Sequence, residues 1–147
     1  MSGQNPGSSF RIPTMLHHLS FGVADLRRSA AFYDAALGAL GFVRVWGDFE
    51  GGANDQAVGY GRAGGGDKFA IKQRTAAPIS APAGFHVAFA APDHAAIHRF
   101  HAEALAHGGT DNGAPGPRPH YGPNYYAAFV IDPDGYHVEA VLNAPAA

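Results

Sequence analysis

HHLSFGVAD, residues 17–25, recurs in altered form as FHVAFAAPD, residues 85–93. In this repeat His18 matches His86, and each stretch ends in an aspartate that precedes a run with helical spacing. Apolar residues alternate with polar or small ones within each stretch, which is the period of a half-buried strand. An aspartate directly before such a run is typical of a helix N-cap. The two stretches therefore predict the same strand-to-helix unit twice in one chain.

Short extended segments follow each predicted helix and are separated by turns rich in glycine or by DPDG, so each half reads β-α-β-β-β. Neither half alone could cover its own sheet. We predict an α+β fold in which two βαβββ modules form one curved eight-stranded mixed sheet around a cup, with the helices outside. The modules span about residues 15–74 and 84–143, joined by an Ala/Pro-rich linker at 75–83. Residues 1–14 are predicted to be a flexible arm, and residues 15–147 a single domain.

The composition excludes several classes of protein. The chain has 147 residues and a net charge of −2, so no basic surface for nucleic acid is expected. It contains no cysteine, which excludes disulfides and thiolate chemistry. No apolar run approaches the ~20 residues of a membrane span, so no membrane partner is expected and a cytoplasmic location is predicted. Nine histidines make a metal site worth seeking.

Two longer stretches carry a family resemblance. LHHLSFGVADLRRSAAFYDAALGALGF, residues 16–42, and YYAAFVIDPDGYHVEAV, residues 125–141, resemble the opening and closing signatures of the vicinal oxygen chelate superfamily. This superfamily includes glyoxalase I, bleomycin-resistance proteins, extradiol dioxygenases and fosfomycin-resistance thiol transferases. The resemblance covers about residues 15–143. It implies the fold, whereas the reaction stays open because these proteins perform different chemistry on one scaffold.

The resemblance implies a metal centre with His18, His86 and Glu139 as ligands of one divalent ion, either Fe, Mn, Ni or Zn. Strand parity supports this, because His18 and His86 lie opposite the apolar face that must meet the helices. A fourth family position falls on Ile71 or, with a slip of one residue, on Lys72. Neither is a carboxylate, so the glyoxalase I ligand set is incomplete. Two histidines and one glutamate leave room for substrate on such an ion.

Tyr126 is predicted to act with Glu139 in catalysis. If the DPDG turn holds two or four residues, opposed strand positions place Tyr126 on the same face as Glu139. The phenol could then protonate an oxygen of the substrate, and the alternative is a tyrosine in the cup wall. His137 also shares the face of Glu139 and is a substitute ligand.

The segment TDNGAPGPRPHYGPNY, residues 110–125, is predicted to be a long loop rich in proline and glycine. Long loops in compact domains are often functional, so Arg118, His120 and Tyr121 are predicted to bind substrate; the alternative is a solvated loop. Three histidines with helical spacing lie on the second predicted helix and are interpreted as a solvated surface: His94, His98 and His101.

Two functions remain open. The first is a metal-dependent enzyme that acts on a small oxygenated substrate as a dioxygenase, a lyase or isomerase, or a thiol transferase. The second is a metal-free protein that sequesters a small molecule, as bleomycin-resistance proteins do. Small members of the superfamily often pair, so a homodimer is expected. The linker at 75–83 contains proline, which disfavours a tight reversal, so the modules could be exchanged between two chains.

Overall fold

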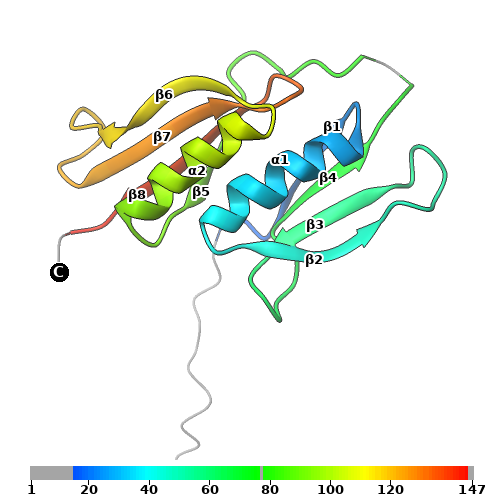
Figure 1. Cartoon of the computed structure of the whole chain (residues 1–147), viewed down its shortest axis with the longest axis horizontal. Coiled ribbons are helices and arrows are strands. Elements are labelled where there is room, and N and C mark those ends of the chain that lie inside the picture. Colours follow the sequence, from blue (N-terminus) through cyan, green and yellow to red (C-terminus); the bar gives the residue numbers. More distant parts are fainter. Residues whose placement is uncertain (1–14, 77, 146–147) are drawn as a thin grey trace, which may run out of the picture.

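The computed structural model describes residues 15–76 and 78–145, so the predicted arm at 1–14 lies outside the described residues. Its elements, in chain order, are β1 (Leu19–Val23), α1 (Leu26–Ala39), β2 (Val43–Asp48), β3 (Ala57–Gly61), β4 (Phe69–Gln73), β5 (His86–Ala90), α2 (His94–Ala106), β6 (Thr110–Pro117), β7 (Tyr125–Ile131) and β8 (His137–Asn143). The order βαβββ occurs twice (Figure 1), which confirms the predicted α+β class. We call β1–β4 with α1 the first module and β5–β8 with α2 the second. No helix in the described part of the chain is long and apolar enough to cross a membrane.

Both helices begin and end as the local sequence predicts. The carboxylate of Asp25 accepts a hydrogen bond from the Arg28 backbone N–H at 3.2 Å, and that of Asp93 accepts one from Ala96 at 2.7 Å. These bonds satisfy N–H groups that have no partner within the helix. Just beyond the helices, Gly41 and Gly108 adopt φ values of +92° and +97°, a conformation that favours glycine and stops the helix.

The strands form two four-stranded sheets with the same topology. Their orders are β1-β4-β3-β2 and β5-β8-β7-β6. In each module the first strand pairs with the last in parallel, and the remaining pairs are antiparallel. The sequence predicted one curved eight-stranded sheet, whereas β1 and β5 are edge strands of separate sheets among the described residues. The repeat therefore holds at the level of topology, but the two sheets are not joined within one chain.

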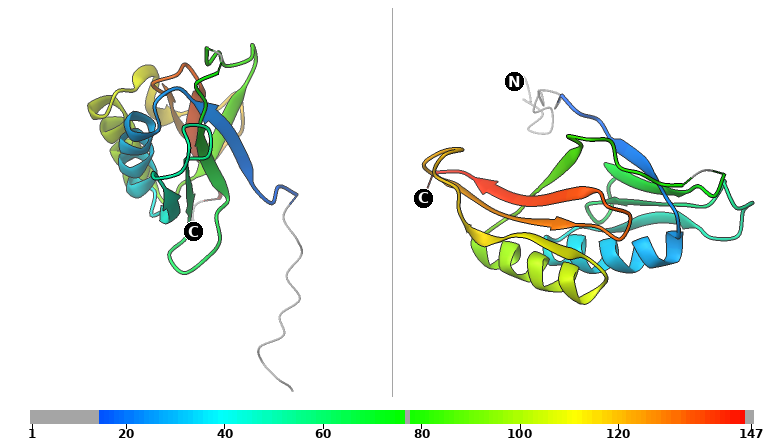
Figure 2. Two further views of the ribbon diagram at one scale, coloured as in Figure 1. Left: turned by 90° about the vertical axis from the view of Figure 1, so that its right-hand side faces the viewer. Right: turned by 90° about the horizontal axis from the view of Figure 1, so that it is seen from above.

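The two helices lie side by side in one layer, and the sheets lie over them (Figure 2). Each sheet thus has one face that packs on the helices, where the aromatic and aliphatic core is buried. We call the opposite face of each sheet its open face. By strand register, the open face of the first sheet carries Ser20, Gly22, Gly59, Ala70 and Lys72, and that of the second carries His86, Ala88, Tyr125, His137 and Glu139.

Specific contacts join the modules where the turn between β7 and β8 meets α1. The ring of Tyr136 packs against that of Phe21 in β1, tilted by 31°, with 3.9 Å between ring centroids. The buried carboxylate of Asp132 accepts a hydrogen bond of 2.6 Å from the hydroxyl of Tyr33 in α1. Asp134 accepts bonds from side chains in the first turn of α1. Because burying a carboxylate is favourable only with such partners, these contacts define one arrangement of the modules.

The prediction of a long loop at residues 110–125 was wrong for its first half. Residues 110–117 form β6, an edge strand whose register with β7 shifts twice, around Gly113. Prolines are tolerated there because an edge strand leaves some N–H positions without a ladder partner. The guanidinium of Arg118 donates hydrogen bonds to the carbonyls of Ala114, Gly116 and Pro117. These bonds stabilise the irregular backbone of the strand. The remaining connection, residues 118–124, is short.

Candidate functional site

The register of β7 and β8 decides which tyrosine faces the candidate site. Ile131 pairs with His137, so five residues, 132–136, separate the last paired positions. The sequence prediction assumed two or four, and an odd number reverses the side on which every β7 side chain lies. Tyr125, and not Tyr126, therefore shares the open face with Glu139, and the predicted orientation of Tyr126 was wrong.

His86, Glu139 and Tyr125 meet on the open face of the second sheet. Nε2 of His86 lies 2.7 Å from Oε1 of Glu139, and the hydroxyl of Tyr125 donates a hydrogen bond to Oε2. Only 2% of the Glu139 side chain is exposed, whereas 51% of the His86 side chain is exposed. Burial, followed by the hydrogen bond to Glu139, raises the pKa of Tyr125 to about 12. The phenol thus keeps its proton at neutral pH.

Small residues between these three side chains allow them to meet. Ala88 lies next to Glu139 in the register of β5 and β8, so the ring of His86 can reach diagonally across its methyl group. Ala127 lies between Tyr125 and Phe129 on the open face of β7, and Phe129 is the direct partner of Glu139. Larger side chains at Ala88 or Ala127 would separate the ring nitrogen or the phenol from the carboxylate.

His18 does not join this group within one chain. It directly precedes β1, in the other sheet, and its Nδ1 lies 2.9 Å from Nδ1 of His17. Within residues 15–76 and 78–145, no group of three or more His, Cys, Asp or Glu side chains could hold a metal ion. Two of the three predicted ligands are thus brought together, and the third belongs to the first module.

The first module has no carboxylate at the position that matches Glu139. Glu139 pairs with Ala88 in the second module, and the corresponding pair in the first is Ala70 with Ser20. The counterpart of Glu139 is therefore Ala70, which corrects the predicted counterparts Ile71 and Lys72. The sequence comparison was off by one because the modules differ in length between their first and last strands. The conclusion that no fourth carboxylate is present is unchanged.

Tyr126 lies on the helix side of the second sheet, against the histidines of α2. Its ring stacks on His94 with 3.7 Å between centroids, and its hydroxyl lies 2.6 Å from Nε2 of His98. His101 lies 2.9 Å from a carboxylate oxygen of Asp111. His94 and His98 are exposed, as the predicted solvated helix surface requires, but they also contact Tyr126.

The segment 118–124 lies beside the open face of the second sheet. Tyr121 is 60% exposed, and its ring contacts that of Tyr125 at 5.2 Å between centroids. Together with Arg118 and His120 it lines a shallow hollow of about 260 Å³. Tyr121 also lines a neighbouring hollow of about 370 Å³ with His86 and His137. The predicted substrate-binding residues thus surround one region, although the Arg118 guanidinium is already bonded to backbone carbonyls.

Tyr125 is the functional candidate that sequence reasoning missed. Two consecutive tyrosines in a strand must face opposite sides of the sheet, so one of the pair was bound to lie on the open face. The choice between Tyr125 and Tyr126 depends on the length of a turn. The presence of five residues between Ile131 and His137 would have selected Tyr125 if the turn had been taken to span all of them.

Known proteins share this fold, and one of them shares about a third of this sequence. The sequence profile of the Glyoxalase/Bleomycin resistance protein/Dioxygenase superfamily matches residues 15–140. A glyoxalase/bleomycin resistance protein from Albidiferax ferrireducens is 33% identical and has a TM-score of 0.70, over 87% of this chain and 98% of that chain. No curated protein sequence matches the chain.

Two more distant structures show the likeness of fold alone. Glyoxalase I from Zea mays is 24% identical with a TM-score of 0.67, over 87% of this chain but only 46% of the maize chain. A glyoxalase-related enzyme from Fulvimarina pelagi is 20% identical with a TM-score of 0.65, over 89% of each chain. The profile match, the 33% identity and the repeated βαβββ topology agree: this chain belongs to the glyoxalase/bleomycin resistance protein/dioxygenase superfamily.

Proposed function

We propose that the protein is a metal-dependent enzyme that acts on a small oxygenated substrate at the open face of the second sheet. The observation that supports this is the pair of His86 and Glu139, with 2.7 Å between nitrogen and oxygen. Imidazole nitrogen and carboxylate oxygen are donors that first-row divalent metals accept. Glu139 is 2% exposed and contacts no Lys or Arg within the described chain, so a bound cation would compensate its charge.

The third ligand, His18, would come from a second copy of the chain. The modules of one chain are tied together through Tyr33, Asp132 and Tyr136, which leaves His18 by a different sheet from that of Glu139. The open face of the first sheet also exposes large apolar groups. Trp46 is 42% exposed and lies over Gly59, where an added Cβ would be 2.3 Å from the indole nitrogen. Pairing of first and second modules across a homodimer would cover this surface and complete the ligand set.

The residues around the pair suit a reaction on a small polar molecule. A bound divalent ion would supply Lewis acidity to adjacent substrate oxygens. Tyr125 holds one oxygen of Glu139, so the carboxylate presents its other oxygen in a defined direction. Tyr121 and Phe129 provide aromatic walls beside this group. The reaction is one of the types that this superfamily carries out: that of a dioxygenase, of a lyase or isomerase, or of a thiol transferase.

Metal content tests the enzyme proposal against a metal-free sequestering protein. Protein from metal-replete cells should contain about one divalent ion per chain by plasma mass spectrometry. His86→Ala should lose most of this metal and remain folded, because the side chain is exposed and lies outside the core. His107→Ala is the matched control and should keep its metal, since this exposed histidine lies at the end of α2, next to Glu103 and away from Glu139. Metal-free wild-type protein, or full occupancy in His86→Ala, would contradict the proposal.

A mixed dimer tests exchange of modules. Chains with His18→Ala and Glu139→Ala, carrying different tags, are co-expressed and purified through both tags. With exchange, one of the two sites regains all three ligands, so about half of the wild-type metal returns, whereas each homodimeric variant stays nearly metal-free. Recovery of no metal in the mixed dimer, or a monomer in light scattering at micromolar concentration, would exclude a shared site.

A further inference from the structure

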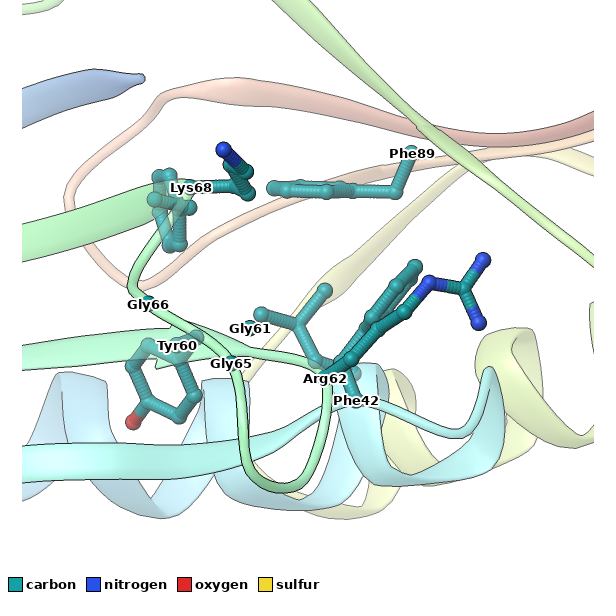
Figure 3. A pocket seen from close by; sticks show the side chains of 10 residues that line it. Phe42, Tyr60, Gly61, Arg62, Gly65, Gly66, Lys68 and Phe89 are labelled. Carbon is teal, nitrogen blue, oxygen red and sulfur yellow. The ribbon is translucent and has the colours of Figure 1, made fainter. Parts of the chain in front are cut away.

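A largely apolar cavity lies where the two modules meet, on the helix side of both sheets. We call each place where residues of both modules meet on that side a seam: one contains Phe21 and Tyr136, and the other contains Phe89 and this cavity. It has a volume of about 240 Å³. Four aromatic residues line it: Phe42, Tyr60, Phe69 and Phe89. The glycine-rich segment 61–66 forms one wall, and Figure 3 shows the ring of Phe89 from β5 lying alongside Lys68 of the first module. His86 and Phe89 lie on opposite faces of β5, so this cavity is separate from the metal-site candidate.

The repeat explains why the cavity exists. By the register that matches the modules, Asp67 is the counterpart of Tyr136, and Phe89 is the counterpart of Phe21. At the other seam the ring of Tyr136 packs against that of Phe21 with 3.9 Å between centroids. At this seam an aspartate replaces the tyrosine and does not line the cavity. The space against Phe89 thus corresponds to one aromatic ring that the chain itself does not supply.

The size of the cavity agrees with this comparison. An apolar cavity of about 150 Å³ is known to take up benzene. A volume of about 240 Å³ therefore buries one ring with a short substituent, but not the whole of a fused system of three rings.

Two cations stand at the mouth of the cavity. Arg62 and Lys68 line it and are both exposed, and neither forms an ion pair within residues 15–76 and 78–145. The Arg62 guanidinium lies 5.8 Å from the centroid of the Phe42 ring. Long basic side chains commonly place their apolar stems on an apolar surface and their charge in water. Figure 3 shows the two charged groups on opposite sides of the cavity, and because both side chains are long and exposed, each can turn toward an anionic group on a ring held there.

We propose that this cavity binds a small aromatic monoacid, with its ring against Phe89 and its carboxylate toward Arg62 and Lys68. The ligand would occupy the space that Tyr136 fills at the opposite seam. The N-terminal residues 1–14 are a poorer occupant, because they contain one arginine and no acidic residue and so do not complement the two cations. The site is distinct from the proposed metal centre and goes beyond the proposed function.

Binding of phenylacetate to the full-length protein tests the proposal, with the isosteric neutral phenylacetamide for comparison. We expect phenylacetate to bind about tenfold more tightly than phenylacetamide, since two exposed cations each contribute modestly. In ¹H–¹⁵N spectra the amides of Gly65, Gly66 and Lys68 should shift. 9-Anthracenecarboxylate should compete only weakly, because three fused rings cannot all be buried in this volume. Equal affinity for acid and amide, or shifts centred on His86 and Glu139, would overturn the proposal.

Two sets of variants separate the ring contact from the charge contact. Asp67→Tyr places a tyrosine at the position of Tyr136 and should weaken both ligands at least about tenfold by filling the cavity; Asp67→Ala, which removes the same charge, should not. The double variant Arg62→Gln/Lys68→Gln should abolish the preference for the acid, whereas Arg99→Gln on α2 should leave it unchanged. Wild-type affinity in Asp67→Tyr would show that the ligand binds elsewhere and would end the proposal.

Discussion

The first and second modules share one topology but differ in what their matching positions carry. Glu139 in the second module corresponds to Ala70 in the first, and Tyr136 corresponds to Asp67. The second module therefore has a buried carboxylate with two partners on its open face, and its turn fills the seam against Phe21. The first module has an open face with an exposed tryptophan and a seam with a cavity.

The comparison shows which features the fold requires, because both modules have them, and which belong to the candidate site, because only the second module has them. Strand alternation, helix caps and helix packing are common to both modules, because each sheet must bury one face on a helix. The positions on the open faces are free of that requirement, so they can differ without changing the topology. Three predictions test the comparison.

The largest expected effect is a difference in packing between the two seams. Phe21 contacts four rings, those of Tyr33, Phe69, Phe85 and Tyr136, whereas Phe89 contacts the ring of Phe69 and borders the cavity. Phe21→Ala should lower the free energy of unfolding by about 2–3 kcal/mol, somewhat less than for a fully buried phenylalanine, because Phe21 is partly buried. Phe89→Ala should cost less than about half of that, since part of its surface already lacks packing partners.

Urea denaturation of both variants measures this difference. The slope of the free energy with urea concentration should stay at the wild-type value, so that the midpoints report stability. Equal losses for Phe21→Ala and Phe89→Ala would mean that the two seams are equally well packed, and the comparison of the modules would then fail at this point.

The second effect concerns the two consecutive tyrosines of β7. Tyr125→Phe removes the hydroxyl that bonds Glu139, and loss of such a partner of a metal ligand weakens metal binding by about 10–100-fold. Tyr126→Phe removes the hydroxyl beside His98, on the other side of the sheet, and should leave metal affinity unchanged. Competition with a metal-binding dye measures both affinities. If Tyr126→Phe weakened metal binding and Tyr125→Phe did not, Tyr126 would face Glu139, as the sequence predicted.

The smallest expected effect is a pH dependence of stability from Asp132. Burial raises the pKa of this carboxyl in the folded state, although bonds from Tyr33 and two backbone N–H groups oppose the shift. The folded state therefore binds the proton more tightly than the unfolded state, and stability falls as pH rises from the ordinary range of a carboxyl through the raised value. Asp132→Asn should lessen this fall.

The measurement is the free energy of unfolding of wild type and Asp132→Asn between pH 3 and pH 7. The difference between the two proteins should shift in favour of Asp132→Asn as pH rises, while Glu103→Gln, at an exposed carboxylate on α2, should follow the wild type. A difference that stays constant over this range would mean that Asp132 does not titrate with a raised pKa.

Local patterns in the sequence were sufficient for much of the fold. The caps at Asp25 and Asp93, the alternation in β1 and β5, and the βαβββ order of each half were predicted and are observed. These features depend on residues within one or two turns or strands, so their physical causes are complete in a short segment. The placement of His86 and Glu139 on one open face follows from the same alternation.

Other features depend on single residues of register or on distant partners. Tyr125 replaced Tyr126 at the site because the turn at 132–136 holds an odd number of residues, and one residue reverses every side chain in a strand. A strand near Thr110 was expected from the βαβββ order, but its extent to Pro117 was missed because its irregular backbone is held by Arg118, a contact that no local periodicity reveals.

By itself the sequence determined the family, the repeated module and which residues have ligand-type side chains, because these follow from local order along the chain. The tertiary structure decided that His18, just before β1, lies by a different sheet from that of His86 and Glu139, and that one seam is filled by Tyr136 while the other contains a cavity. Both depend on how α1 and α2 pack together and on where the turn after β7 meets Tyr33. Such packing is set by the shapes of surfaces far apart in sequence, and only the folded chain brings them into contact.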